Sequence, residues 1–168
     1  MTCVKTETQS KNILKKLVSI IRNIDKDILE TILTDTEFNP GDIRIAMINT
    51  DFDCGFKIKR EILHRLVIDK DYYSSFEPTI YPGVNIKYYF NKEKQDTGIC
   101  NCEGKCNGKG KDGFCKKITV AVFNSGKIII TGGQSYEQLN TAYDFIDNTI
   151  KNNKKELILA DRGENLNE

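Results

Sequence analysis

Several segments of the chain alternate apolar and polar residues with the period of a β-strand. Residues 117–123 and 127–132 are the strongest of them, and Asn124-Ser125-Gly126 between them is typical of a hairpin turn. Two more extended segments are rich in Tyr, Phe, Ile and Val, and Tyr81-Pro82-Gly83 divides them. The predicted strands are residues 43–49, 72–80, 84–90, 117–123 and 127–132.

Apolar residues recur with helical spacing in four other segments. In the first of these, Ile13, Leu17 and Ile20 share one face and Ser10 is a suitable N-cap. Asn39-Pro40-Gly41 interrupts the chain before the first predicted strand. The predicted helices are residues 10–23, 27–33, 57–68 and 135–152.

From the first strand onwards the predicted order is β-α-β-β-insertion-β-β-α, which indicates an α+β fold. A curved antiparallel sheet with helices on one face is the natural packing, because both long helices have a single apolar side. The other face of the sheet is then either solvated or bound to a partner. From about residue 156 the chain is charged, and a frayed tail is expected.

Composition excludes several classes of protein. The 168 residues carry a net charge of +1, which excludes a strongly basic nucleic-acid coat and an acidic tail protein. No apolar run is long enough for a transmembrane helix, and the N-terminus lacks the apolar core of a signal peptide. We therefore expect an intracellular protein in a reducing compartment, without a membrane partner. A single histidine, His64, and no nucleophile–base pair predict no enzymatic activity.

Four of the six cysteines, namely Cys100, Cys102, Cys106 and Cys115, lie in a polar insertion, residues 91–116. Four thiolates suit tetrahedral zinc, so a structural zinc ion is one interpretation. Disulfides, or free thiols in a mobile loop, are the alternatives. The insertion is also rich in lysine, which fits either contact with a DNA backbone or a solvated loop.

An internal repeat is a further possibility. When the N-terminus is laid on the C-terminal helix, Leu14 falls on Tyr143, Leu17 on Ile146 and Ile21 on Ile150. Any two amphipathic helices can align in this way. Alternatively, residues 1–23 are the closing part of an earlier copy of the same unit.

Two motifs carry a resemblance to a known family. They are Phe76-Glu77-Pro78-Thr79-Ile80-Tyr81-Pro82-Gly83 and Phe123-Asn124-Ser125-Gly126-Lys127-Ile128-Ile129-Ile130-Thr131-Gly132. Both resemble motifs in the second repeat of the TATA-box-binding protein family, and the match covers about residues 42–155 without the insertion. The cysteine-rich insertion is most similar to the TATA-binding-like proteins of large cytoplasmic DNA viruses. A bias towards Lys, Asn and Ile, whose codons are AT-rich, agrees with that source.

The resemblance implies a half saddle whose concave sheet lies on the DNA minor groove, with an aromatic pair wedged between base steps. It assigns Tyr81 and Phe123 as wedges. Groove-lining positions match Ile48, Ala121, Ile129 and Thr131, and phosphate-facing positions match Lys87 and Lys127. A base-contacting asparagine of the family falls on Ala46, or on Asn49 in a shifted register. The surface for transcription factor IIB matches Glu77, Thr79 and Ile80.

These correspondences predict a transcription initiation factor that binds AT-rich double-stranded DNA and recruits a transcription factor IIB-like factor or RNA polymerase. One alternative is an interaction scaffold that kept the fold and lost minor-groove binding. A third is an unrelated sheet that stacks RNA bases on aromatic side chains. If the chain is viral, the host cytoplasm (at a viral factory) or the virion is the expected location, and otherwise the nucleus.

The expected organisation has three parts: residues 1–41 as the closing helix of a preceding repeat with a linker, residues 42–155 as the repeat itself, and residues 156–168 as the tail. A complete saddle needs a second half. We expect about 80–100 further residues before Met1, carrying a first repeat with its own aromatic pair. If that repeat is absent, a homodimer would have to rebuild the saddle.

Overall fold

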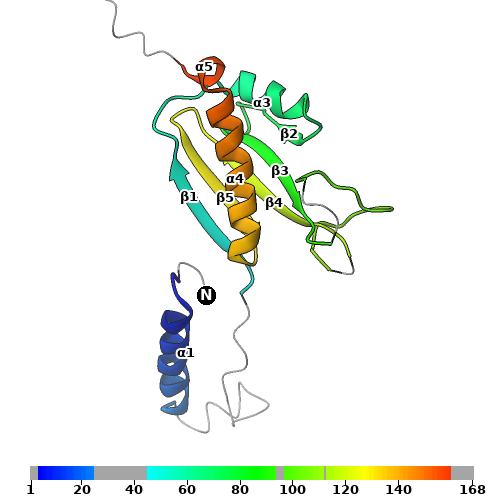
Figure 1. The fold of residues 1–168 in the computed structure, drawn as a ribbon. Coiled ribbons are helices and arrows are strands. Elements are labelled where there is room, and N and C mark those ends of the chain that lie inside the picture. Colours follow the sequence, from blue (N-terminus) through cyan, green and yellow to red (C-terminus); the bar gives the residue numbers. More distant parts are fainter. Residues whose placement is uncertain (1–3, 25–44, 94–96, 112, 160–168) are drawn as a thin grey trace, which may run out of the picture. The chain divides into compact units, whose positions relative to one another are not determined.

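The computed structural model describes residues 4–24, 45–93, 97–111 and 113–159 (Figure 1). The chain divides into a unit of residues 1–45 and a unit of residues 46–168. In the first unit, helix α1 spans Glu7–Arg22, and the Thr6 side chain caps it by accepting from the Gln9 amide. The helix therefore begins one turn earlier than predicted from Ser10. The predicted helix at 27–33, the break at 39–41 and the proposed boundary at 41/42 lie outside the described residues.

The second unit is built on one antiparallel sheet of five strands in the order β1-β5-β4-β3-β2 (Figure 1). The strands are β1 (Ile48–Asp53), β2 (Tyr73–Ser75), β3 (Val84–Phe90), β4 (Lys116–Val122) and β5 (Lys127–Gly133). With helices packed against this sheet, the predicted α+β fold is confirmed.

Two strands differ from their predicted bounds. β1 begins at Ile48, five residues after the predicted start at 43. β2 ends at Ser75, although extended structure was expected to reach residue 80. The reason is a turn, in which the amides of Ile80 and Tyr81 both donate to the Glu77 carbonyl.

The helices of this unit are α3 (Arg60–Ile68), α4 (Tyr136–Asn152) and the short α5 (Lys154–Leu157). Ser135 caps α4 by accepting a hydrogen bond from the Gln138 amide. The expectation of a frayed tail from residue 156 is wrong for its first residues. Leu157 is fully buried, its carbonyl accepts from the Lys59 amide, and the Leu159 amide donates to the Lys57 carbonyl.

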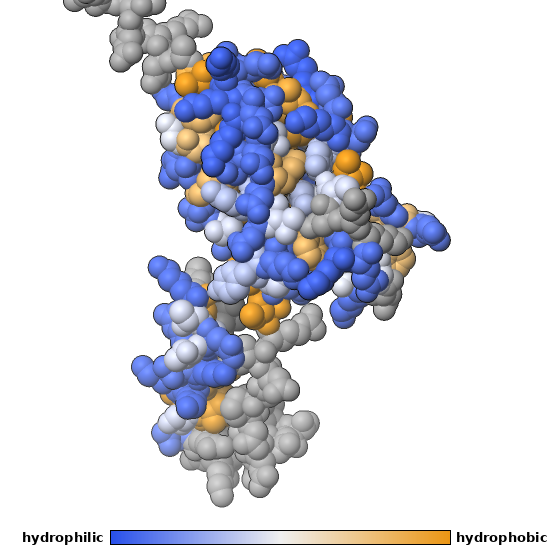
Figure 2. Space-filling view, in the orientation of Figure 1, coloured by the Kyte–Doolittle hydropathy of each residue, from blue (hydrophilic) through white to orange (hydrophobic). Residues whose placement is uncertain are grey.

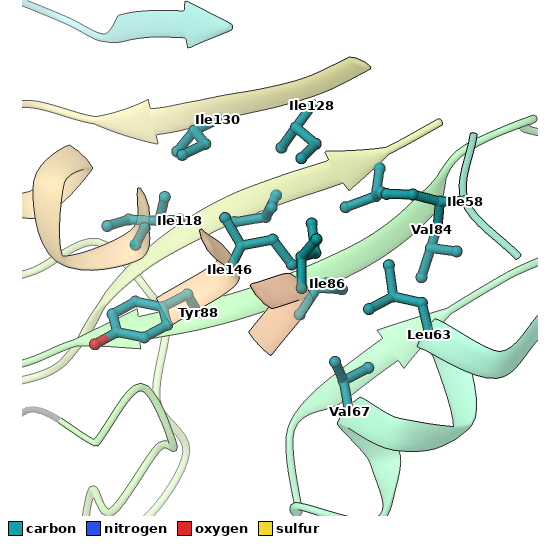
Figure 3. Close-up of a cluster of buried hydrophobic side chains, with 14 of the residues drawn as sticks. Ile58, Leu63, Val67, Val84, Ile86, Tyr88, Ile118, Ile128, Ile130 and Ile146 are labelled. Carbon is teal, nitrogen blue, oxygen red and sulfur yellow. The ribbon is translucent and has the colours of Figure 1, made fainter. Parts of the chain in front are cut away.

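The core lies between one face of the sheet and the helices, as the close-up shows (Figure 3). Strand alternation turns Ile118, Val120 and Val122 of β4 towards Ile146 of α4. α3 adds Leu63 and Val67 to the same core cluster. The outer surface of α4 is largely hydrophilic, as expected for a helix with one buried side (Figure 2). None of the described helices has the length and apolarity needed to cross a membrane.

This one-sided core makes a direct prediction for two neighbouring residues. Ile130→Ala should lower the free energy of unfolding by about 2–5 kcal/mol, because Ile130 is 0% exposed and its loss leaves a cavity. Ile129→Ala should lower it by only about 1 kcal/mol, since Ile129 is 39% exposed on the opposite face. Urea denaturation of the two variants measures the difference. Equal decreases in the free energy of unfolding would contradict a core on only one face of the sheet.

Candidate functional site

The sheet face opposite the helices is called here the open face. It carries the residues that alternate with the core positions, and the strand register aligns them in rows. One row across the sheet consists of Tyr73, Lys87, Thr119, Thr131 and Asn49. The next row consists of Ser75, Asn85, Ala121, Ile129 and Asp51. Hydroxyl and amide groups thus lie beside a small apolar patch of Ala121 and Ile129.

Four of the residues predicted at a binding face lie in these rows: Lys87, Ala121, Ile129 and Thr131. Ile48 does not, because it packs against the core on the helix side. Alternation along β1 puts Ile48 on the same side as Phe52, which also packs against the core. The pairing is irregular beside it, with Ile48 opposite Gly133 and Asn49 opposite Thr131. Gly132, at φ +96°, is the extra residue on β5, and its backbone conformation favours glycine. The prediction for Ile48 is therefore corrected, and Asn49 is the β1 residue on the open face in this row.

An aromatic pair stands at the hairpin end of the open face. The ring centroids of Tyr81 and Phe123 are 5.8 Å apart in an edge-to-face arrangement. The hairpin fixes Phe123, whose amide donates to the Lys127 carbonyl and whose carbonyl accepts from Gly126. Gly83 lies against both rings, where a Cβ would come within 2.9 Å of the Tyr81 ring. The two predicted wedge residues are thus brought together.

Arg60, which the sequence analysis did not single out, supports the turn that carries Tyr81. Its guanidinium donates to the Pro82 carbonyl and lies 5.1 Å from the centroid of the Phe76 ring. Because Arg60 begins α3, the helix layer is tied to the edge of the open face. Arg60 precedes Pro82 by twenty-two residues, so no local sequence pattern indicates this hydrogen bond.

The polar groups of the open face are partly satisfied among themselves. Thr131 Oγ1 donates to Asn49 Oδ1 at 2.5 Å, and Lys87 Nζ donates to Thr119 Oγ1 at 2.9 Å. Asn85 Oδ1 is buried without a hydrogen-bond partner among the described residues. Asn85 was also missed by the sequence analysis, although the alternation of residues 84–90 already put it on the same side as Lys87.

Charge on the open face is mixed. Burial, and then the nearby charge of Lys117, lower the pKa of Lys87. Lys127, another predicted phosphate-facing residue, is exposed and lies 3.8 Å from Asp53. Asp51 is exposed in the row that contains Ile129. Acidic groups on β1 therefore stand on the same face as the lysines.

The predicted partner surface follows β2. Thr79 Oγ1 donates to Glu77 Oε1 at 2.8 Å, and Ile80 is 84% exposed. These residues form the turn that leads directly to Tyr81. An exposed apolar residue beside an acidic one is a suitable protein contact, and it adjoins the aromatic pair.

The four clustered cysteines converge in space. The Sγ atoms of Cys100, Cys102, Cys106 and Cys115 all lie within 4.8 Å of one another, and the group could hold a metal ion. Cys102 Sγ and Cys115 Sγ are 3.3 Å apart. Cys115 is buried, and this burial raises the pKa of its thiol to about 12. Cys54 lies elsewhere, with its thiol donating to the Phe56 carbonyl.

Comparison with known proteins gives a consistent result. A family model described as "Transcription factor TFIID (or TATA-binding protein, TBP)" matches residues 42–153. A "TATA-box-binding protein-like" protein of Acanthamoeba polyphaga mimivirus is 28% identical over 176 residues, which cover 99% of this chain and 44% of that protein. The structure of Methanococcus jannaschii TBP matches with a TM-score of 0.51 and 21% identity, over 89% of this chain and 66% of that one. The chain thus spans less than half the length of the mimivirus protein.

The close packing of Gly83 predicts that Gly83→Ala displaces the aromatic pair. A Cβ at 2.9 Å from the Tyr81 ring forces that ring to move, and the ring is free to do so because Tyr81 is exposed. Nuclear Overhauser contacts between the Tyr81 and Phe123 rings should weaken, while stability falls by no more than about 1–3 kcal/mol. Unchanged ring contacts in the variant would contradict the packing described above.

Proposed function

The chain belongs to the TATA-binding protein family, and on this premise we propose that it is a transcription initiation factor that binds duplex DNA in the minor groove. The family is one of non-enzymatic DNA-binding factors. The observation that carries the proposal is the open face itself: the sheet surface opposite α3 and α4, with the Tyr81–Phe123 pair at its end.

The chemistry of the open face suits the minor groove. A·T pairs present only acceptors there, and the hydroxyl of Thr119 and the amides of Asn49 and Asn85 can donate to them. Ala121 and Ile129 give an apolar surface that can lie against sugars and base edges. An aromatic side chain at the hairpin can enter a base step and kink the duplex. AT-rich DNA is therefore the proposed ligand.

Recruitment of the transcription machinery is assigned to the exposed turn before Tyr81. Glu77, Thr79 and Ile80 offer an acidic and an apolar contact to a transcription factor IIB-like factor or RNA polymerase. Such a chain acts where its genome is transcribed: the host cytoplasm or the virion for a viral protein, and the nucleus otherwise.

A full saddle needs a partner for β1. Among the described residues, β1 pairs only with β5, so its other edge can accept another strand. A further stretch of the same polypeptide, or a second copy in a homodimer, would supply that strand.

A structural zinc ion at the four-cysteine cluster is part of the same proposal. Zinc in structural sites is bound tetrahedrally by four protein ligands, and thiolates are among its preferred ones. Four cysteine ligands leave no open position for catalysis, which agrees with a non-enzymatic factor.

An interaction scaffold that has lost DNA binding is the second candidate, and one observation favours it. Asp51 and Asp53 of β1 stand on the open face, where phosphates of a bound duplex would approach. Carboxylates facing phosphates oppose binding, whereas a protein partner with basic residues would be attracted.

The aromatic pair gives the first test of these two functions. Phe123→Ala should reduce affinity for an AT-rich duplex about tenfold or more and abolish bending, because base–aromatic stacking is worth ~1–3 kcal/mol. Lys127→Ala should instead weaken binding to all sequences alike and lower the salt dependence by about one unit. Fluorescence anisotropy and a bending assay separate the two effects.

The control is Tyr136→Ala, since Tyr136 is an exposed aromatic at the start of α4, on the helix side of the sheet. It should change neither affinity nor bending. Wild-type protein that binds no DNA at low salt, or a Phe123→Ala variant that binds and bends DNA like wild type, would refute minor-groove binding through this face.

The acidic edge gives the second test. Asp51→Asn should strengthen DNA binding severalfold, because it removes one like charge from the open face without changing side-chain volume. Asp69→Asn, at the end of α3, is the matched control and should leave affinity unchanged. If Asp51→Asn gains no affinity while a basic protein partner loses its binding to this variant, the scaffold function is supported instead.

A further inference from the structure

The segment between β3 and β4 is hydrogen-bonded to the sheet. The Tyr89 amide donates to the Gly98 carbonyl at 2.9 Å, two residues beyond Lys87, the last β3 residue that pairs with β2. The Lys117 amide donates to the Gly108 carbonyl at 2.9 Å, and the Gly110 amide to the Cys115 carbonyl at 3.0 Å. These bonds lie at the start of β4, before Thr119, the first β4 residue that pairs with β5. Residues 97–98 and 108–110 are therefore called the sheet extension.

The four cysteines stand next to this extension in sequence. Cys100 follows Gly98 by two residues, and Cys106 precedes Gly108 by two. Cys115 directly precedes the first residue of β4. An ion bound to all four Sγ atoms would join both flanks of the extension to the start of β4.

The sulfur positions fit a tetrahedral ion. A Zn–S distance of about 2.3 Å places the sulfurs of a tetrahedron about 3.8 Å apart. The separations here are 3.3 Å from Cys102 Sγ to Cys115 Sγ and 4.0 Å from Cys115 Sγ to Cys100 Sγ. None of the five cysteines in the described part of the chain is joined in a disulfide.

Side-chain hydrogen bonds from Tyr72 to the Thr97 carbonyl and from Asn91 to the Gly113 carbonyl also hold the segment, but it buries little apolar surface. The segment is rich in glycine, and five of its glycines (Gly98, Gly104, Gly108, Gly110 and Gly113) have positive φ. Most of its side chains are exposed or half-buried, with Cys115 the one buried hydrophobic residue between Thr97 and Cys115 in the described chain. Glycine loses more conformational freedom on folding than any other residue. A few backbone hydrogen bonds therefore offset only part of the entropy cost of ordering this segment.

We propose that a zinc ion held by Cys100, Cys102, Cys106 and Cys115 fastens the sheet extension to β3 and β4. Metal occupancy then determines the order of the end of the open face that carries Tyr89 and Lys117, opposite the aromatic pair. This inference rests on the proposed zinc site and is independent of DNA binding. The ion acts as a structural part of the sheet and lengthens the ordered surface beyond the five strands.

The test combines metal analysis with hydrogen exchange on the full chain under reducing conditions. Wild-type protein should contain about one zinc per chain. The double variant Cys102→Ser/Cys106→Ser should lose it, and the amides of Tyr89, Gly110 and Lys117 should exchange at least tenfold faster. The amides of Val120 and Ile130 should keep their protection, because the core does not depend on the ion.

Cys54→Ser is the matched control, since its thiol lies outside the cluster, and it should keep both the zinc and the protection. A chelator added to wild-type protein should cause the same loss of zinc and the same faster amide exchange as the double variant.

The proposal is overturned by wild-type protein that lacks zinc, holds iron instead, or contains disulfides among the four cysteines. It is also overturned if zinc is lost while the three amides exchange as slowly as before. Absence of DNA binding would refute the proposed function and leave this result untouched.

Discussion

The burial of a single face of the sheet is the constraint on which this domain depends. α3 and α4 cover one side, and β3, β4 and β5 place Val and Ile side chains there to form the core. Side chains alternate between faces, so this requirement also decides which residues remain on the other side. Ile130 is held in the core, and for that reason Ile129 and Thr131 are presented outwards. The candidate binding surface is a direct consequence of how the core is packed.

Much of this arrangement could be predicted from local pattern. The hairpin of β4 and β5 has clear alternation and an Asn-Ser-Gly turn, so the faces of Ala121, Ile129 and Thr131 followed at once. The four cysteines could be named as a group, but spacing alone left metal, disulfide and free thiol open. Their convergence within 4.8 Å occurs in a segment that Gly98 and Gly108 bond to the sheet, and the spacing of the cysteines does not reveal these bonds.

The parts that could not be predicted depend on contacts between distant residues. Ile48 was expected on the open face from the family resemblance, but it lies on the side of β1 that carries Phe52, whose ring packs against Tyr143 of α4. Leu157 was expected in a charged, frayed tail, yet its carbonyl accepts from the amide of Lys59, nearly one hundred residues earlier. Arg60 reaches the Pro82 carbonyl from the start of α3. In each case contacts between residues far apart in the sequence set the position of the side chain, and local residue preferences do not predict such contacts.

The exposed edge of β1 has a further consequence, for self-association. An unpaired strand edge is a template for indiscriminate pairing, and natural sheets protect such edges with charged side chains. Asp51 and Asp53 lie on this edge strand, and Asp53 lies 3.8 Å from Lys127. Like charges directly opposite each other across a strand pair are destabilising, so two copies would have to pair in a register that keeps these carboxylates apart. A strand that carries basic residues meets no such restriction, and the acidic pair therefore limits the ways in which this edge can associate.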